Sequence, residues 1–288
     1  KLKNPDGSRQ MATGRSLLQR AKDIRKMWYR GGTCYSIDCS SFDGSLGWLA
    51  EWEREATLKT YQGYEHYKDL KRCFDTQTWL DVKARGLKAK IFGNRASGTA
   101  GTSVANKIVM ISALKFATHR SYYNGNVKFY CDGDDTLIFV KPGHEHNMDS
   151  WMRRLKLLGL DTKVENVAKT PEDVVFCRSQ MVFTPKGWML IKRPMDAFKT
   201  MCGVMRHFKG TQLLDYFFTM NVGYKKLWDG VPVMGALSEI FGDQGKFDAK
   251  LLSGDEFYKL RGCSRVTPHL QIRPEHRNSF AMTFGIPV

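Results

Sequence analysis

The stretch "FYCDGDDTLIFV", residues 129–140, carries the strongest signal for the fold of this chain. It places Asp132, Gly133, Asp134 and Asp135 in a turn between two apolar runs. Asp-Gly between apolar runs is typical of a β-hairpin. Carboxylates about 4 Å apart repel each other by ~4 kcal/mol per pair at an effective dielectric of ~20. Either another group offsets that cost, or the side chains point apart.

Two interpretations of the acidic turn are open at this point. A surface hairpin with its turn at residues 131–134 accounts for Asp132 and Gly133, but not for two further acids where the second strand should begin. A cation site accounts for those acids, because Mg²⁺ takes oxygen ligands, often one or two carboxylates with substrate phosphates completing the shell. The rest of the chain has to decide between them.

Composition narrows the class of protein. Lys plus Arg is 45 and Asp plus Glu is 29, which gives a net charge of +16. This excess favours a polyanionic partner, nucleic acid first and an acidic membrane second. Hydrophobic residues make up 42% of the 288 residues, enough for a sizeable core. The seven cysteines form no Cys-x-x-Cys pair, which argues against zinc and suits reduced thiols in a cytosolic setting.

The order of predicted elements indicates an α+β fold with an antiparallel sheet. A long buried helix and an amphipathic helix alternate with short strands, and the last part of the chain has a helical pattern. The predicted elements are a helix over 16–28, a strand over 33–37, helices over 46–61 and 104–119, a hairpin over 127–140, a helix over 149–160, a strand over 161–167, a hairpin over 174–191 and helices over 195–288.

Three polar patterns stand near these elements. Asp38 and Asp43 flank the end of the first strand, and Thr102 and Asn106 lie four apart, so they share one helix face. Capping by Ser97 or Thr99 is an alternative role for the residues before that helix, but it leaves Asn106 unexplained. The patterns are Asp38-x4-Asp43, Ser97-Gly98-x3-Thr102-x3-Asn106 and Gly133-Asp134-Asp135.

In this order and at these spacings the set resembles the palm of viral RNA-dependent RNA polymerases, and more narrowly the tombusvirus and carmovirus group of positive-strand RNA viruses. The resemblance covers residues 33–192. The matching segments are "DCSSFD" (38–43) for motif A, "SGTAGTSVAN" (97–106) for B, "YCDGDD" (130–135) for C, "LGLDTKV" (158–164) for D and "FCRSQMVF" (176–183) for E.

The resemblance implies a role for each matching residue. Asp38 and Asp134 would hold two divalent ions, Mg²⁺ with Mn²⁺ as the alternative, and Asp135 would be a further, less direct carboxylate ligand. Asp43 and Asn106 would recognise the ribose 2′-hydroxyl of the incoming nucleotide. The supporting nucleotide-binding residues would be Ser97, Gly98 and Thr102.

Two motifs carry weaker assignments. Motif D of the family offers a lysine near the triphosphate as a general acid, and both Lys163 and Lys169 fit; a solvated role is open for either. In motif E, Arg178 and Ser179 would contact the RNA backbone, although an ordinary surface arginine fits equally well.

The resemblance also implies the organisation and the partners. Residues 1–32 would be a remnant of fingers and palm entry, because no basic motif is found there. Residues 33–192 would form the palm with an inserted fingers segment at 62–95, and 193–288 a mostly helical thumb. The first methionine is Met11, which predicts a piece of a longer protein. The partners would be template and nascent RNA, ribonucleoside triphosphates and other viral replication proteins, at a membrane-associated complex in the host cytoplasm.

Two other functions compete with an RNA-directed RNA polymerase. A reverse transcriptase shares the palm, but it usually lacks the Asp43–Asn106 pair and places an aromatic residue near the ribose. A non-enzymatic RNA-binding module would keep a basic groove without turnover. Extension with ribonucleotides, with deoxyribonucleotides and with inactivated controls separates the three.

Overall fold

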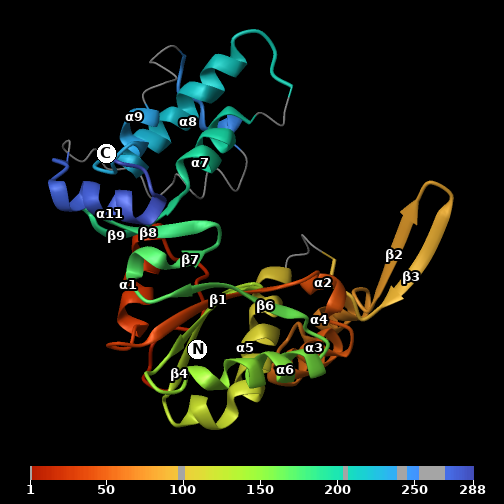
Figure 1. Ribbon diagram of the computed structural model, residues 1–288. Helices are drawn as coiled ribbons and strands as arrows, with labels where there is room; N and C mark the ends of the chain where they lie inside the picture. Colours follow the sequence, from red (N-terminus) through yellow and green to blue (C-terminus); the bar gives the residue numbers. More distant parts are fainter. Residues whose placement is uncertain (1, 97–100, 204–206, 239–244, 253–269) are drawn as a thin grey trace. The chain divides into compact units, whose positions relative to one another are not determined.

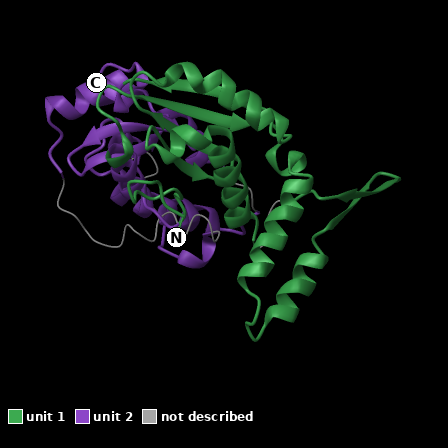
Figure 2. Ribbon diagram, turned by 90° about the horizontal axis from the view of Figure 1, so that it is seen from below, with its two compact units in different colours: residues 1–13, 26–169 green, residues 14–25, 170–288 purple. Residues whose placement is uncertain are grey.

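The computed structural model describes the chain except for residues 1, 97–100, 204–206, 239–244 and 253–269 (Figure 1). The chain divides into two compact units (Figure 2): residues 1–13 and 26–169 form the first, and residues 14–25 and 170–288 form the second. The segment predicted as one palm, 33–192, is therefore divided at 169/170. The physical reason is that the motif E hairpin packs within the second unit, against the C-terminal helix.

The first unit is built on a four-stranded antiparallel sheet in the order β4-β5-β1-β6. Strands distant in the sequence lie side by side, because β1 inserts between β5 and β6 and so pairs with two strands more than 90 residues further along the chain. The predicted α+β class with an antiparallel sheet is confirmed. The strands are β1 (Thr33–Cys39), β4 (Val127–Asp132), β5 (Asp135–Val140) and β6 (Thr162–Ala168).

The acidic turn joins β4 to β5 through a two-residue loop. Asp132 pairs with Asp135, so Gly133 and Asp134 form the loop. Gly133 has φ +81°, whereas Asp134 does not have a positive φ, which is the type II′ pattern with glycine first. The turn expected at 131–134 is therefore wrong by one residue. The reason is that a primed two-residue turn matches the twist of the strands, so β5 already begins at Asp135.

Helices cover the sheet and supply most of its core. The central one is α5 (Thr102–Tyr123), which packs against β4, α3 and α6 (Figure 1). Its buried residues are mostly apolar, as the sequence predicted for a helix at 104–119. The other helices of this unit are α2 (Phe42–Ser45), α3 (Trp48–Thr60), α4 (Tyr67–Asp75), η1 (Glu145–Asn147) and α6 (Met148–Leu157).

The segment predicted as inserted fingers, residues 62–95, contains α4 and a two-stranded ribbon. The strands β2 (Trp79–Ala84) and β3 (Leu87–Phe92) pair only with each other. Both views show this ribbon projecting away from the rest of the first unit (Figures 1 and 2).

The second unit combines a three-stranded sheet with helices. Its core includes Val182, Ile191, Trp228 and Phe280. Where it is described, the region after residue 193 is helical, as predicted. The elements are α1 (Leu17–Met27, whose residues 26 and 27 are assigned to the first unit), η2 (Pro171–Asp173), β7 (Val175–Phe176), β8 (Ser179–Thr184), β9 (Gly187–Lys192), α7 (Pro194–Cys202), α8 (Gln212–Trp228), α9 (Met234–Leu237), η3 (Ala249–Leu251) and α11 (Pro274–Phe284).

Among the described residues, no helix combines the length and the apolar character that crossing a membrane requires.

Candidate active site

A row of charged side chains crosses the four-stranded sheet at the end of β1. Asp132 on β4 pairs with Asp135 on β5, and Asp38 on β1 pairs with Lys163 on β6. The β1–β5 pairs run to Ile37 and Thr136, so one further step sets Asp38 opposite Asp135. Residues directly opposite on antiparallel strands project from the same face. The row therefore reads Asp132, Asp135, Asp38 and Lys163 across the sheet.

The carboxylates are close enough to affect one another's ionisation. Burial, followed by the charges of Asp134, Asp38, Asp132 and Glu165, raises the pKa of Asp135 to about 6. Burial, together with the charges of Asp38 and then Asp43, also raises the pKa of Asp134. The structure thus places the three predicted metal ligands within range of one another's charge, and it keeps two of them in an environment that disfavours negative charge.

This arrangement predicts that Asp135→Asn stabilises the chain near neutral pH. The pKa of Asp135 is raised on folding, so its favourable contribution is present at low pH and lost as pH rises through about 6. Removing the charge should raise the free energy of unfolding at pH 7.5 by about 1–2 kcal/mol, allowing for partial solvent screening. The gain should shrink as pH falls and vanish near pH 3, below the ordinary pKa of 3.8, where the carboxyl is neutral in both the folded and the unfolded chain.

Thermal unfolding of the variant and the parent at both pH values checks this. Asp161→Asn is the matched control, because the Asp161 side chain is 70% exposed. A stabilisation that is equal at both pH values would contradict the electrostatic explanation.

Lys107 was missed by the sequence analysis. It follows Asn106 on α5, and its side chain is only 2% exposed. Its Nζ lies 2.8 Å from Asp132 Oδ1 and donates a hydrogen bond to Ser103 Oγ at 2.7 Å. This buried cation offsets part of the carboxylate repulsion at one end of the row. Its position directly after Asn106, with apolar residues following it in the helix, was the signal that could have revealed it.

Asp43 and Asn106 meet beside the carboxylates. Asp43 lies in α2, just after β1, and Asn106 lies in the second turn of α5. Asn106 Nδ2 donates to Asp43 Oδ1 at 2.7 Å. The amide oxygen of Asn106 is buried and has no hydrogen-bond partner among the residues that the structure describes. A buried acceptor without a partner is uncommon and suggests a ligand that supplies a donor.

The other predicted nucleotide-binding residues are less informative. Thr102 Oγ1 donates to the Ala96 carbonyl at 3.0 Å, next to the start of α5. Ser97 and Gly98 lie outside the described residues.

The structure separates the two candidate lysines. Lys163 Nζ lies 3.9 Å from Asp38 Oδ2 and 3.8 Å from Glu165 Oε1, in the charged row. Lys169 donates to the Thr33 hydroxyl, at the opposite end of β1. Thr33 and Asp38 are five residues apart, roughly 17 Å along a strand. Lys169 therefore does not lie with the carboxylates, because β6 runs antiparallel to β1 and carries it away from them.

The two motif E residues belong to the second unit. Cys177 and Arg178 form the two-residue loop between β7 and β8, and both have positive φ, at 50° and 56°. This type I′ geometry leaves Arg178 exposed. Ser179 is only 6% exposed, and its hydroxyl donates to the Cys177 carbonyl. The contact of Arg178 and Ser179 with RNA stays a prediction.

The expected divalent ions require oxygen ligands that lie close together. Among the described residues, no group of three or more His, Cys, Asp or Glu side chains converges closely enough to hold a metal ion. The three predicted ligands therefore do not form a complete cage. Mg²⁺ typically uses one or two carboxylates, with phosphates and waters completing its shell. Asp38 and Asp134, two neighbouring carboxylates that sense each other's charge, fit such a partial site.

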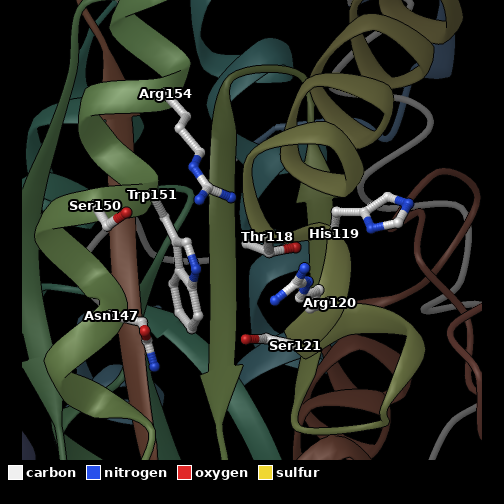
Figure 3. Close-up of a pocket in the computed structure, with 8 residues that line it drawn as sticks. All are labelled: Thr118, His119, Arg120, Ser121, Asn147, Ser150, Trp151 and Arg154. Carbon is white, nitrogen blue, oxygen red and sulfur yellow. The ribbon is translucent and has the colours of Figure 1, made fainter.

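A separate pocket of about 480 Å³ lies between α5 and α6 (Figure 3). It is lined by residues including Thr118, His119, Trp151 and Arg154. Thr118 is twelve residues along α5 from Asn106, about 18 Å away. The lining contains no carboxylate, so this pocket is distinct from the charged row and offers no hard-cation ligands.

The fold of the chain indicates the class of protein to which it belongs. The chain resembles the solved RNA-dependent RNA polymerase of a human picobirnavirus, with a TM-score of 0.61 and 16% sequence identity. The match covers 75% of this chain and 43% of that one. The fold is that of a viral polymerase.

The chain belongs to the viral RNA-dependent RNA polymerase family, whose family model matches residues 7–288. It is 25% identical over 288 residues to the RNA-directed RNA polymerase of tobacco necrosis virus strain A, covering 95% of this chain and 39% of that protein. It is 26% identical over 199 residues to the carnation ringspot virus enzyme, covering 67% of this chain and 26% of that protein. The predicted family, including its tombusvirus and carmovirus type, is confirmed. The chain spans well under half the length of these relatives.

Proposed function

We propose that this chain carries out template-directed RNA synthesis, transferring a nucleotide from a ribonucleoside triphosphate to an RNA 3′-hydroxyl during replication of a viral RNA genome. The observation that carries the proposal is the grouping of Asp38, Asp134 and the Asp43–Asn106 pair at one edge of the sheet. The polymerase family and fold support it.

Asp38 and Asp134 would hold two divalent ions, Mg²⁺ or alternatively Mn²⁺. When bound, such ions lower the pKa of an attacking hydroxyl and neutralise charge on the leaving group. The chain's own contribution is to present the two carboxylates from β1 and from the tight turn after β4. Asp135, beside them on β5, adds a further carboxylate to the same group.

Asn106 and Asp43 would select ribonucleotides. One amide hydrogen of Asn106 is used by Asp43, while its buried amide oxygen is left to accept from a ligand hydroxyl. A ribose 2′-hydroxyl is both donor and acceptor, and can supply that missing donor. A deoxyribose cannot, so the amide oxygen would stay buried and unpaired, at a cost of about 1–3 kcal/mol.

Asn106→Ala and Asp43→Ala should therefore narrow the preference for ribonucleotides over deoxyribonucleotides by roughly 5- to 150-fold. The measurement is the ratio of kcat/KM for the two substrates. Asn147→Ala, the same change on η1, is the matched control. If both variants keep the parent ratio, these residues do not recognise the ribose.

Lys163 is the better-placed candidate for the general acid, because it lies in the charged row and Lys169 does not. Removal of a general acid or base lowers the rate of the reaction by about 10²-fold or more. Lys163→Gln should lower kcat for single-nucleotide addition by about that factor, with little change in RNA affinity. Lys169→Gln should be close to the parent. If Lys163→Gln and Lys169→Gln added nucleotides at equal rates, Lys163 would not be the general acid.

A primer-extension assay tests the function as a whole. Incorporation of ribonucleotides that requires both template and divalent metal supports the proposal. A preference for deoxyribonucleotides would indicate a reverse transcriptase, and RNA binding without incorporation would indicate a binding module.

The proposed partners are template and nascent RNA, ribonucleoside triphosphates and other viral replication proteins. The proposed location is a membrane-associated complex in the host cytoplasm. Co-fractionation of the chain with host membranes during infection checks the location, and recovery only in the membrane-free fraction would contradict it.

A further inference from the structure

The β2–β3 ribbon separates its side chains onto two chemically different faces. Cross-strand partners share a face, and successive pairs alternate between faces. One face carries the pairs Leu80–Ile91, Val82–Ala89 and Ala84–Leu87, all apolar. The other carries Trp79–Phe92, Asp81–Lys90 and Lys83–Lys88. We name this basic and aromatic face the polar face.

The polar face holds an excess of positive charge. Lys83, Lys88 and Lys90 lie on it with Asp81, and Arg85 stands in the turn at the tip, so the ribbon carries four cations against one acid. All four cations are exposed. Among the described residues, none of them forms an ion pair. Lys83 and Lys88 are directly opposite each other, and like charges in that position destabilise a ribbon. A polyanion lying along this face would reverse that cost.

An aromatic pair accompanies the cations. Trp79 and Phe92 stand edge to face, with ring centroids 5.1 Å apart. They are 54% and 51% exposed, so both rings remain open to solvent. Cations that track a phosphate backbone, combined with aromatic rings on which bases stack, are the usual means of binding single-stranded nucleic acid. An acidic peptide would satisfy the lysines, but it would give the rings no such partner.

We propose that the polar face of the β2–β3 ribbon, formed by Trp79, Lys83, Lys88, Lys90 and Phe92, binds single-stranded RNA outside the active site. The choice of RNA as the polyanion rests on the proposed function. The location and the binding mode rest on the ribbon itself: phosphates lie along the lysines, and a base stacks at the Trp79–Phe92 end.

Binding of a short labelled single-stranded RNA to the 288-residue chain, followed by fluorescence anisotropy over a salt series, tests the lysines. Losing two phosphate contacts in Lys83→Gln/Lys88→Gln should weaken binding by about 25-fold at 0.1 M salt and reduce the slope of log K against log salt by about 1.4. Lys141→Gln/Lys156→Gln removes the same charge from exposed positions outside the ribbon and should stay close to the parent. The ribbon variant relieves a like-charge pair, so it does not weaken binding by unfolding the ribbon.

The aromatic part is tested at Trp79. Trp79→Leu should weaken binding by about 5- to 150-fold, the range for one stacked base, while Trp79→Phe should retain most of the affinity. If the leucine and phenylalanine variants bind equally well, the stacking role is overturned. If Lys83→Gln/Lys88→Gln binds RNA like the parent, with an unchanged salt slope, the ribbon is not an RNA site and its partner is a protein.

Primer extension, measured in parallel, keeps the two proposals apart. A chain that extends a primer but binds RNA independently of the ribbon overturns this inference and leaves the polymerase function standing. A chain that binds RNA through the ribbon but adds no nucleotide under any metal condition supports the inference and overturns the proposal that these 288 residues by themselves carry out RNA synthesis.

Discussion

Asp134→Ala is expected to abolish nucleotide addition while leaving RNA affinity nearly unchanged. Asp38→Ala should behave in the same way. These carboxylates are proposed to hold the divalent ions, and removal of one preorganised electrostatic group costs roughly 10²–10³-fold in rate. Loss of a direct metal ligand should lower the rate of nucleotide addition by at least about 10³-fold, the upper end of that range. Affinity for RNA, in contrast, comes mostly from Lys and Arg through counterion release.

The comparison requires a preparation in which the parent chain extends a primer. Single-nucleotide addition is measured at matched RNA occupancy with Mg²⁺ and then with Mn²⁺, and RNA affinity is measured over a salt series. Asp161→Ala, an exposed acid close to β6, serves as the control. If Asp134→Ala retained more than a trace of metal-dependent extension, the assignment of this site would be wrong.

Lys107→Met should destabilise the fold strongly. It removes the buried cation that lies 2.8 Å from Asp132 Oδ1, next to Asp135 in the sheet. Breaking one side of a buried pair costs about 3–5 kcal/mol. Because the Asp132 side chain is 21% exposed, the lower end, about 3 kcal/mol, is expected. Extension should fall as well, because the turn that carries Asp134 loses its attachment to α5.

A double-mutant cycle separates charge from packing. Lys107→Met combined with Asp132→Asn leaves no unpaired charge, and it should recover much of the lost stability in chemical denaturation. Lys156→Met breaks an exposed pair with Asp161 at 3.8 Å and should cost less than about 1 kcal/mol. If the double variant were no more stable than Lys107→Met, the ion pair would not be the cause of the effect.

The acids of the proposed active site carry a stability cost. Burial and mutual repulsion raise the pKa values of Asp134 and Asp135, which means that their charged forms are disfavoured in the folded chain. Strained or destabilised active sites are a recurrent price of activity in proteins. Asp135→Asn is expected to gain stability near neutral pH, whereas Asp134→Ala is expected to lose activity. Together the two variants would show this trade-off between stability and activity within one turn.

Several elements of the site followed from local sequence patterns. Asp-Gly between apolar runs predicted the β4–β5 hairpin, because a turn of this kind depends on a few adjacent residues. The spacing of Thr102 and Asn106 placed both on one helix, because helical periodicity is local. The motif resemblance then predicted that Asp43 and Asn106 belong together, and the 2.7 Å hydrogen bond between them agrees with that expectation.

Other features depend on contacts between segments far apart in the sequence. The sequence alone could not choose between Lys163 and Lys169, because the answer lies in the register of β6 against β1, which includes an irregularity between Ser36 and Ile37. It could not reveal that Lys107 is buried against Asp132, since helical position does not indicate which distant strand a side chain meets.

By itself, therefore, the sequence determined the kind of fold, the acidic turn and the family, because turn chemistry, periodicity and motif spacing are written in neighbouring residues. The tertiary structure decided which charges face one another across the sheet and where each lysine lies. It also decided that Ser179 is buried and that the β2–β3 ribbon stands exposed with its lysines and aromatic rings on one face. The physical reason is that strand register and burial are set by packing among distant segments, and a shift of one residue in register would turn every side chain of a strand to the other face.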